Sequence, residues 1–366
     1  MSIRALSLVT LLLLASTFPT ATASASEQSL SLSAGVSNAY NNNFLEYSPN
    51  QLDRFKAGTN PLRFSLESTD DVILSPSVSL TWELDHGGGR RHALRAHWDG
   101  DFHGTNAGAD YRSYSARWTE SFKGNRRLAV GFGRMDNFYV RQLRDEDLPA
   151  GLGDARWTRA QFDQDAITAS WRQPAGKNMK LGLAYRHDKR DYVPAFTERS
   201  SNANQGEVSL GWDGLPKRGA IELSAGYRQS KAEANDHDAI IGDDDDVSYG
   251  GILAGATGRM EFSRSKAMRW GGDLGVDVAT RNYDSKLPVA VDPFHAGRND
   301  MLVGVEAGLR AAYLRWDARA FFRVENNNAN LGTGAAPTSD SGSYSKHQFG
   351  LELSWSGDLW KSAKSN

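Results

Sequence analysis

Apolar and polar residues alternate with a period of two in many separate segments of this chain. The clearest is ALRAHWDGDFHG, residues 93–104, where Leu94, Ala96, Trp98 and Phe102 alternate with charged residues and histidines. Successive side chains of a strand point to opposite faces, so the pattern predicts a strand with one apolar and one charged face. Taken alone, the segment suits a sheet facing water and a sheet facing lipid equally well.

The same alternation recurs along the rest of the chain. Further segments of this kind lie at 78–85, 113–122, 179–186, 207–213, 221–228, 269–281, 303–313, 315–325 and 348–355, with weaker ones at 29–40, 127–140, 157–173 and 247–262. Glu120 interrupts the apolar set of its segment. We expect an all-β chain of about 14 strands, with about 12 or about 16 as the alternatives, many of them long enough to cross a bilayer at a tilt.

The connections between these segments alternate in length. The tight ones lie at 86–91, 123–125, 174–178, 215–219, 263–267 and around Leu314. The long ones lie at 41–76, 104–110, 141–156, 194–204, 233–246, 285–299 and 326–343, and 41–76 is the longest. Short turns at one end and long loops at the other predict an antiparallel up-and-down transmembrane β-barrel with both termini at the short-turn end.

Aromatic residues recur near the predicted short turns and the C-terminus. They are Trp82, Trp118, Trp171, Trp212, Trp270, Tyr313 and Trp355. Such a ring is typical of the interfacial girdle of a membrane barrel. The alternative is a secreted β-sandwich or β-helix, in which these aromatics are ordinary core residues, but its strands are shorter and its connections need not alternate.

The N-terminus has the features of a secretory signal peptide. Arg4 precedes a short apolar run, and Ala23-Ser24-Ala25 provides a cleavage site, so we expect a mature single-domain barrel at 26–366 after removal of residues 1–25. The loss of Arg4 changes the formal net charge from −2 to −3, which gives no electrostatic basis for binding nucleic acid. The chain has no cysteine and therefore no disulfide or thiolate site. Its mean hydropathy is −0.54, and no apolar run after the leader approaches the roughly 20 residues that a spanning helix requires. If the chain enters a membrane, we therefore expect it to do so as strands.

Over the whole mature length, the leader, the alternating strands and the rhythm of turns and loops resemble the porin-like bacterial outer-membrane β-barrel superfamily, without pointing to one family. The resemblance implies the outer membrane of a Gram-negative bacterium, contact with outer-membrane lipid, and assembly by the barrel-insertion machinery. The last segment, HQFGLELSW at 347–355, ends on an aromatic as such barrels usually do, but SGDLWKSAKSN follows it.

The polar parity of the segments predicts a charged lumen. Its expected lining includes Arg95, His97, Asp99, Asp101, Arg117, Arg186, Glu222, Arg228, Asp273, Asp277, Glu306, Arg310, Asp317 and Arg319. A barrel of this size leaves room for a modest aqueous pore, and charges of both signs suit a hydrated polar or anionic solute. Alternatively, these charges pair across neighbouring strands and hold the wall together.

Two sequences suggest sharper chemistry. HWDGDFH, residues 97–103, places two histidines and two aspartates on one face, but residues two apart on a strand lie roughly 6 to 7 Å apart, too far to converge without other strands. The loop 236–246 contains Asp243, Asp244, Asp245 and Asp246, a weak candidate for calcium that lacks EF-hand spacing. We expect no cofactor and no catalytic set, since no G-x-S-x-G motif occurs.

The sequence supports three functions in decreasing order. The first is a channel for diffusion or uptake of small polar solutes, with loop 41–76 as an inward constriction or a lid over the rim, anchored by Phe44, Tyr47, Phe55 and Phe64. The second is a sealed barrel acting in surface adhesion, scaffolding or surface assembly. The third is an outer-membrane enzyme. No oligomeric state and no partner protein are indicated.

Overall fold

The computed structural model describes residues 27–145, 148, 150–233, 247–265, 267–285, 292, 295–331 and 342–362. The strands are β1 (Glu27–Asn41), β2 (Asp71–Asp85), β3 (Arg91–His103), β4 (Tyr111–Phe122), β5 (Arg126–Arg144), β6 (Trp157–Pro174), β7 (Met179–Tyr192), β8 (Ser201–Leu215), β9 (Gly219–Ala232), β10 (Tyr249–Arg264), β11 (Met268–Tyr283), β12 (Asn299–Tyr313), β13 (Trp316–Asn330) and β14 (Tyr344–Lys361). The helices are α2 (Pro49–Lys56) and the 3₁₀ turns η2 (Ala107–Ala109), η3 (Ala150–Arg156), η4 (Pro194–Arg199) and η5 (Pro216–Arg218).

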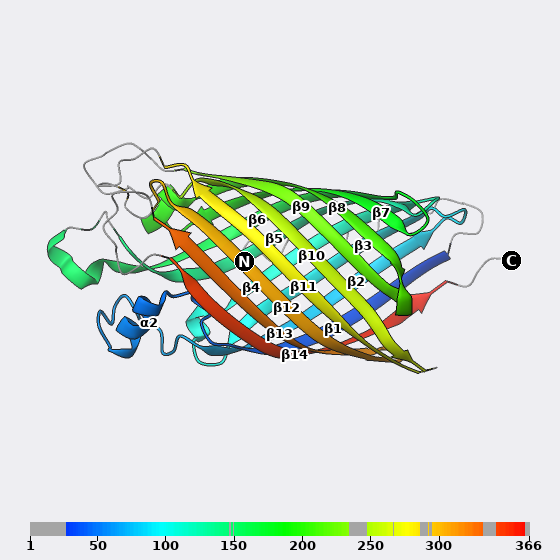
Figure 1. The fold of residues 1–366 in the computed structure, drawn as a ribbon, viewed down its shortest axis with the longest axis horizontal. Helices are drawn as coiled ribbons and strands as arrows, with labels where there is room; N and C mark the ends of the chain where they lie inside the picture. The colour runs from blue at the N-terminus through cyan, green and yellow to red at the C-terminus, as the bar shows by residue number, and fades with distance from the viewer. Residues whose placement is uncertain are drawn as a thin grey trace, which may run out of the picture.

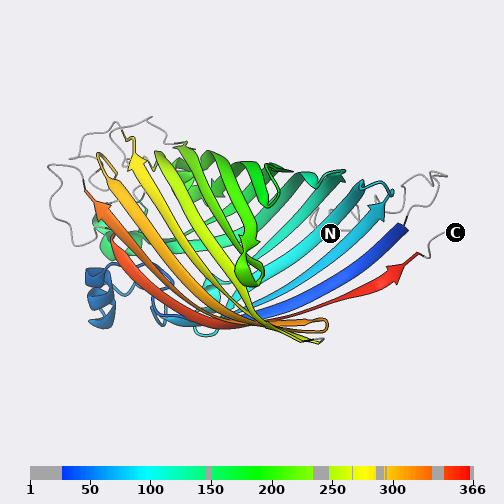
Figure 2. The same ribbon diagram turned by 45° about the vertical axis from the view of Figure 1, so that its right-hand side comes forward.

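Each strand pairs antiparallel with its neighbours in the chain, and β1 pairs with β14 to close the barrel. Figures 1 and 2 show the strands strongly inclined to the long axis, with β1 beginning and β14 ending at the same end. The prediction of an up-and-down antiparallel barrel with 14 strands is confirmed. No helix in the described part of the chain is long and apolar enough to cross a membrane.

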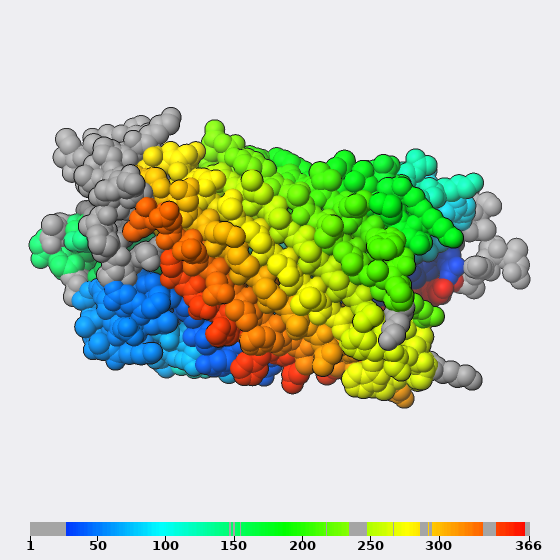
Figure 3. All heavy atoms as spheres, viewed as in Figure 1, coloured from blue at the N-terminus to red at the C-terminus, as the bar shows by residue number. Residues whose placement is uncertain are grey.

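The two faces of the wall differ as the alternation predicts. Large apolar side chains on the outward face are exposed, including Ile252 at 61%, Leu309 at 63% and Leu351 at 67%. In the space-filling view the strands form a continuous wall (Figure 3), and exposed large apolar side chains come from strands all around it. An apolar exterior of this extent is suited to lipid and not to water.

Long and short connections alternate along the chain, so all the long ones lie at one end of the barrel. Several loops are shorter than predicted, because 71–76, 201–204 and 326–330 belong to strands. Polar strand ends that extend past the apolar band read as loops in the sequence. The first connection, which we call L1, is therefore 42–70, and it contains α2.

The last strand continues past Trp355. Residues up to Lys361 pair with the beginning of β1, where Trp360 lies opposite Leu30. Lys361 forms an ion pair with Glu27, and the Gln28 amide donates to the Ser362 hydroxyl at 2.8 Å. Residues 356–361 are thus strand and not tail.

Glu120 lies on the outward face at the short-turn end, and its side chain is only 3% exposed. Arg90 Nε donates to it at 2.8 Å, and His92, which stacks on Trp118, forms an ion pair with it. A buried carboxylate is tolerated when charged partners satisfy it. The break in the apolar pattern therefore marks a small polar cluster below the apolar band.

Candidate functional site

The interior of the barrel is the candidate site, because the predicted lumen residues all lie on its inward face. They come from β3 (Arg95, His97, Asp99, Asp101), β4 (Arg117), β7 (Arg186), β9 (Glu222, Arg228), β11 (Asp273, Asp277), β12 (Glu306, Arg310) and β13 (Asp317, Arg319). Their arrangement differs greatly from one side of the barrel to the other.

The residues of HWDGDFH do not converge on one point. His97 contacts the Ser79 hydroxyl at 2.7 Å and Asp99 at 3.1 Å, while Asp101 accepts hydrogen bonds from Ser75 and Tyr111. His97, Asp99 and Asp101 are each engaged by a residue of a neighbouring strand, and His103 lies 3.4 Å from Asp110 of the following loop. Among the described residues, no group of three or more histidines or carboxylates could hold a metal ion. Asp243, Asp244, Asp245 and Asp246 lie outside the described residues.

A ladder of ion pairs covers the inward face of β11 to β14. Arg319 Nη2 lies 2.5 Å from both Asp273 and Glu306, and its Nη1 lies 3.5 Å from Glu352. Four residues further along β13, Arg323 lies 3.0 Å from Asp277. Arg319 joins carboxylates from the strands on either side of β13, and Arg323 reaches across β12 to Asp277, so both brace this part of the wall.

Two glycines on β12 make this ladder possible. Gly308 lies directly opposite Asp273, and a Cβ built on it would lie 2.7 Å from Arg319 Nε and 2.8 Å from the Asp273 carboxylate. Gly304 lies opposite Asp277 in the same way. Arg319 and its neighbour can therefore reach across a whole strand, because no side chain on β12 blocks the path.

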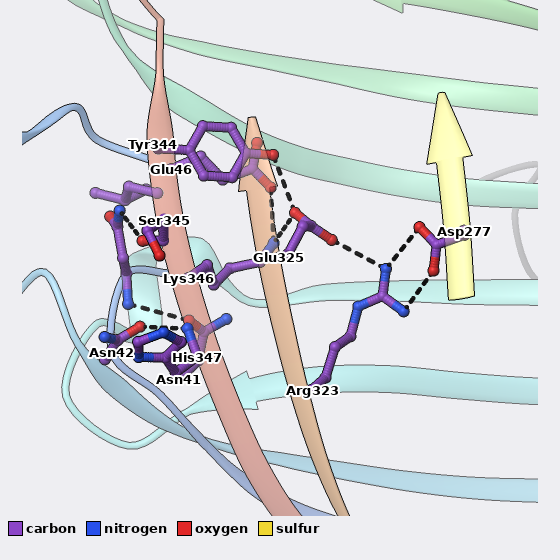
Figure 4. A network of polar contacts seen from close by, with 12 residues as sticks. Asn41, Asn42, Glu46, Asp277, Arg323, Glu325, Tyr344, Ser345, Lys346 and His347 are labelled. Carbon is purple, nitrogen blue, oxygen red and sulfur yellow. Dashed lines mark hydrogen bonds and ion pairs between the residues drawn. The ribbon is translucent and has the colours of Figure 1, made fainter. Parts of the chain in front are cut away.

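The ladder continues towards the long-loop end of the barrel, where it reaches L1. Glu325 accepts from Arg323 at 3.1 Å and from Tyr344 at 3.0 Å, and Lys346 bridges Glu325 at 2.9 Å and Glu46 of L1 at 2.8 Å. Figure 4 shows this chain of contacts running from Glu46 to Asp277 along β13 and β14. We call the Glu46–Lys346–Glu325 contacts the latch. They tie L1 to the lumen wall.

L1 has an apolar core of its own at the rim of the barrel. Leu45, Tyr47 and Phe64 are buried together with Ala109 of η2 and Tyr139 of β5. Phe44 and Phe55 pack against this cluster. The helix α2 is held by a capping box between Ser48 and Gln51.

The contacts of L1 reach far around the rim. Beyond the latch on β14, Arg141 of β5 donates to the Leu45 carbonyl at 3.4 Å, and Arg63 lies over the Trp157 ring of β6 at 4.7 Å. β14 and β6 lie six places apart in a ring of 14 strands. L1 thus packs over nearly half of the rim, the second of the two predicted placements, and Figures 1 and 3 show it beyond the strand ends.

Hydrogen bonds fix the end of L1 that leads into β2. The Ser68 hydroxyl and the Tyr40 phenol both donate to the Asp70 carboxylate and hold its pKa below the usual range. At the other end of the loop, burial raises the pKa of the Tyr47 phenol. Both side chains therefore keep their usual charge at neutral pH.

The opposite wall carries a different charge pattern. All residues of β4, β5 and β6 are described. At the level of the outer apolar band, their inward faces carry the charged residues Arg117, Arg127 and Arg172 and no carboxylate. β5 lies seven places from β12 in the ring, directly across the lumen from the carboxylate-rich ladder. This side of the lumen therefore carries an excess of positive charge, whereas the carboxylates of the ladder are paired with arginines.

Aromatic rings line the inward face towards the long loops. Tyr111, Phe138, Phe162 and Tyr192 follow one another across β4 to β7, with ring centroids 5.0 to 5.1 Å apart. Sequence reasoning missed this row. A bulge at Asn137, which has a φ of 58°, shifts the parity of β5 and turns Phe138 inward, and Tyr111 and Tyr192 lie beyond the ends of the predicted strand segments. The row continues the lumen lining above the charged region.

A cavity of about 330 Å³ lies against the inward faces of β6 to β12. Small residues such as Gly211 and Gly275 lie between its charged lining residues, which are Arg172, Lys180, Asp213, Glu222, Arg259, Asp273 and Glu306. Arg172 Nη2 reaches Glu222 at 3.0 Å, and the two side chains are 48% and 42% exposed. Ion pairs in this part of the lumen are therefore solvated.

The predicted girdle residues Trp82, Trp118, Trp171, Trp212, Trp270, Tyr313 and Trp355 lie on the outward parity of their strands, near the short turns. Trp118, Trp212, Trp270 and Tyr313 are 39% to 50% exposed. Trp316 was missed as a member of this set. It lies directly between Tyr313 and Trp355 in register and is 48% exposed.

The chain is similar to several solved barrels at low sequence identity. A bacterial polysaccharide outer membrane secretin is 12% identical with a TM-score of 0.45, over 89% of this chain and 97% of that one. An anion-selective porin from Comamonas acidovorans is 10% identical with a TM-score of 0.39, over 91% and 100%. OmpT, an outer membrane protein of Vibrio cholerae, is 6% identical with a TM-score of 0.43, over 90% and 99%. No family model and no curated protein matches the chain.

The fold assignment rests on the strand order and the faces of the wall. A closed antiparallel barrel with an apolar exterior and a charged interior has the architecture of outer-membrane β-barrels. The predicted fold, an up-and-down antiparallel β-barrel with an apolar outer face, is therefore confirmed.

Proposed function

We propose that this protein is an outer-membrane channel through which small polar solutes diffuse or are taken up. The observation that carries the proposal is the solvated interior. Arg310 and Asp317 pair at 3.4 Å on the inward face while 53% and 39% exposed, much like the Arg172–Glu222 pair. Half-exposed ion pairs inside a closed wall require water in the lumen, and a lumen filled by side chains would bury them.

L1 narrows the entrance of this channel. It covers the rim from β14 to β6, and the latch fixes it to the inward face of β13 and β14. The hydrogen bonds, ion pairs and ring contacts described above join L1, directly or through Lys346, to β13, β14, β5 and β6, and none of them reaches β7 to β12. Solute therefore enters beside L1.

The test is single-channel conductance of refolded residues 26–366 in a planar bilayer, with Lys346→Met as the main variant. Removal of the ammonium leaves Glu46 without its partner, so we expect a larger or more frequently fluctuating conductance. Lys189→Met is the matched control, because Lys189 pairs with Asp191 on the outward face, away from L1. Steady conductance in the unaltered protein supports a channel.

A second candidate is a sealed barrel that acts at the cell surface in adhesion, scaffolding or assembly. The apolar core of L1, with Leu45, Tyr47 and Phe64 buried against neighbouring segments, favours it. Silence in the bilayer from protein shown to be folded would contradict the channel and support the sealed barrel.

A further inference from the structure

Four arginines form a continuous strip on the inward faces of β3 to β6. Arg95 lies directly opposite Arg117, and Arg127 lies directly opposite Arg172. The two pairs are joined because Arg117 Nη2 crosses β5 and donates at 3.0 Å to the hydroxyl of Ser170, two residues from Arg172. We call these four residues the arginine strip.

Few carboxylates neutralise the positive charges of the arginine strip. Arg95 donates to the Ser79 hydroxyl at 2.7 Å, and Arg127 makes no hydrogen bond or ion pair to any described residue. Only Arg172 reaches a carboxylate, that of Glu222. By contrast, Arg319 on the opposite wall has three carboxylates within 3.5 Å, and its side chain is 11% exposed.

Bracing of the wall does not explain this arrangement. Like charges directly opposite each other on paired strands destabilise the sheet. The ladder on β11 to β14 shows how this chain braces a wall, with a carboxylate for each arginine. The exposed guanidinium groups of Arg95, Arg117 and Arg127 instead face the lumen with donors unused.

Small residues lie beside these groups. The inward residues of β5 next to Arg127 are Ala129, Gly131 and Gly133, so this strand places no bulk against the lumen. A Cβ on Gly131 would lie 2.9 Å from the Thr168 hydroxyl, close to the path that Arg117 takes. The small residues keep the guanidinium groups and nearby hydroxyls accessible from one side.

We propose that solutes carrying a carboxylate or a phosphate group bind to the arginine strip during their passage through the channel. The inference rests on the proposed channel function and specifies its substrate class. A guanidinium matches either anion with two parallel N–H donors. Since the site is hydrated and open on one side, binding is weak enough for release.

The experiment measures current block in refolded residues 26–366 held in a chloride salt. Citrate and inorganic phosphate are the anionic probes, and glycerol is the neutral probe. We expect either anion to reduce the chloride current at concentrations at which glycerol does not. The double variant Arg117→Gln/Arg127→Gln should weaken that block by about tenfold or more, because two charged donors are lost. Block by citrate alone or by phosphate alone supports the site and identifies the group it takes.

Arg269→Gln is the matched control. Arg269 is an exposed arginine on the inward parity of β11, it makes no contact with a carboxylate among the described residues, and its loss removes a lumen charge away from the arginine strip. The variants in the strip remove like-charge repulsion, so they should fold, as heat-modifiable migration on a gel will show.

The outcomes separate the two proposals. A conducting protein that neither anion blocks, or in which block survives in the double variant, overturns the arginine strip and leaves the channel standing. Equal loss of block in Arg269→Gln also overturns it, because the effect would then belong to overall charge. A folded protein without conductance overturns the channel itself.

Discussion

At the scale of single residues, two glycines decide whether a charged wall can be braced. Gly304 and Gly308 have no conformational reason to be glycine, since they lie in regular strand with no positive φ. Their role is steric, because they leave the path of Arg323 and Arg319 across β12 open. The absence of a side chain is thus what allows arginine and aspartate two strands apart to meet.

Gly308→Ala should destabilise the barrel. The added methyl group would displace Arg319 from Asp273, and breaking a partly buried ion pair costs about 1 to 3 kcal/mol. Gly275→Ala is the control, because its Cβ on the same inward face would come no closer than 3.9 Å to a neighbouring atom. Urea unfolding of both variants in lipid or detergent measures the difference, and equal midpoints would refute the steric role.

Parity in the sequence was enough to place charged residues on the inward face, but not to pair them. Arg319 meets Asp273 only because of register and an intervening glycine, and neither is visible in a single strand. Arg127 was absent from the predicted lining, although it shares the parity of Ala129 and Gly131 in a segment whose other parity is apolar. That alternation was a signal that could have found it.

At the scale of elements, L1 and the end of β5 form one unit above the apolar band. The bulge at Asn137 and a second register shift before Arg141 re-aim the end of β5, so that Tyr139 and Arg141 meet Tyr47 and Leu45. No sequence pattern predicted this contact, because bulges break the period on which strand prediction depends. Strand existence was predictable, whereas strand ends in polar sequence were not.

The docking of L1 should weaken in acid through Asp70. Its pKa is lower in the docked loop than in an undocked one, so its stabilising effect is present above about pH 4 and is lost as the pH falls through the lowered pKa. Cleavage within L1 by pepsin should therefore accelerate as the pH is lowered below about 4.

Asp70→Asn should remove much of this acceleration, because the amide cannot titrate. Asp53→Asn serves as the control, since Asp53 is an exposed acidic residue of α2 in the same loop. A cleavage profile that is the same for both variants would show that other groups control docking in acid.

At the scale of the whole molecule, closure depends on the full length of β14. Removal of the residues after Trp355 would remove the β14 partners of five β1 residues, Ser29, Leu30, Ser31, Leu32 and Ser33, which would then pair with β2 alone. We expect a lower thermal unfolding temperature and partial loss of the compact form on an unheated gel. Removal of residues 363–366 alone is the control, because every described contact of β14 survives it. Equal stability of both truncations would show that the end of the seam contributes nothing.

The seam also determines the order in which the molecule can be completed. Every other strand pairs with its neighbour in the chain, whereas Gln28 and Ser362 are 334 positions apart. The entropy of closing such a loop must be lost before its contacts contribute, so ring closure is the slow step of folding. The contact between Lys346 and Glu46, which are 300 positions apart, can form only when β1 and β14 are side by side. Formation of the latch therefore follows ring closure, and an intact contact between Lys346 and Glu46 reports that the ring has closed.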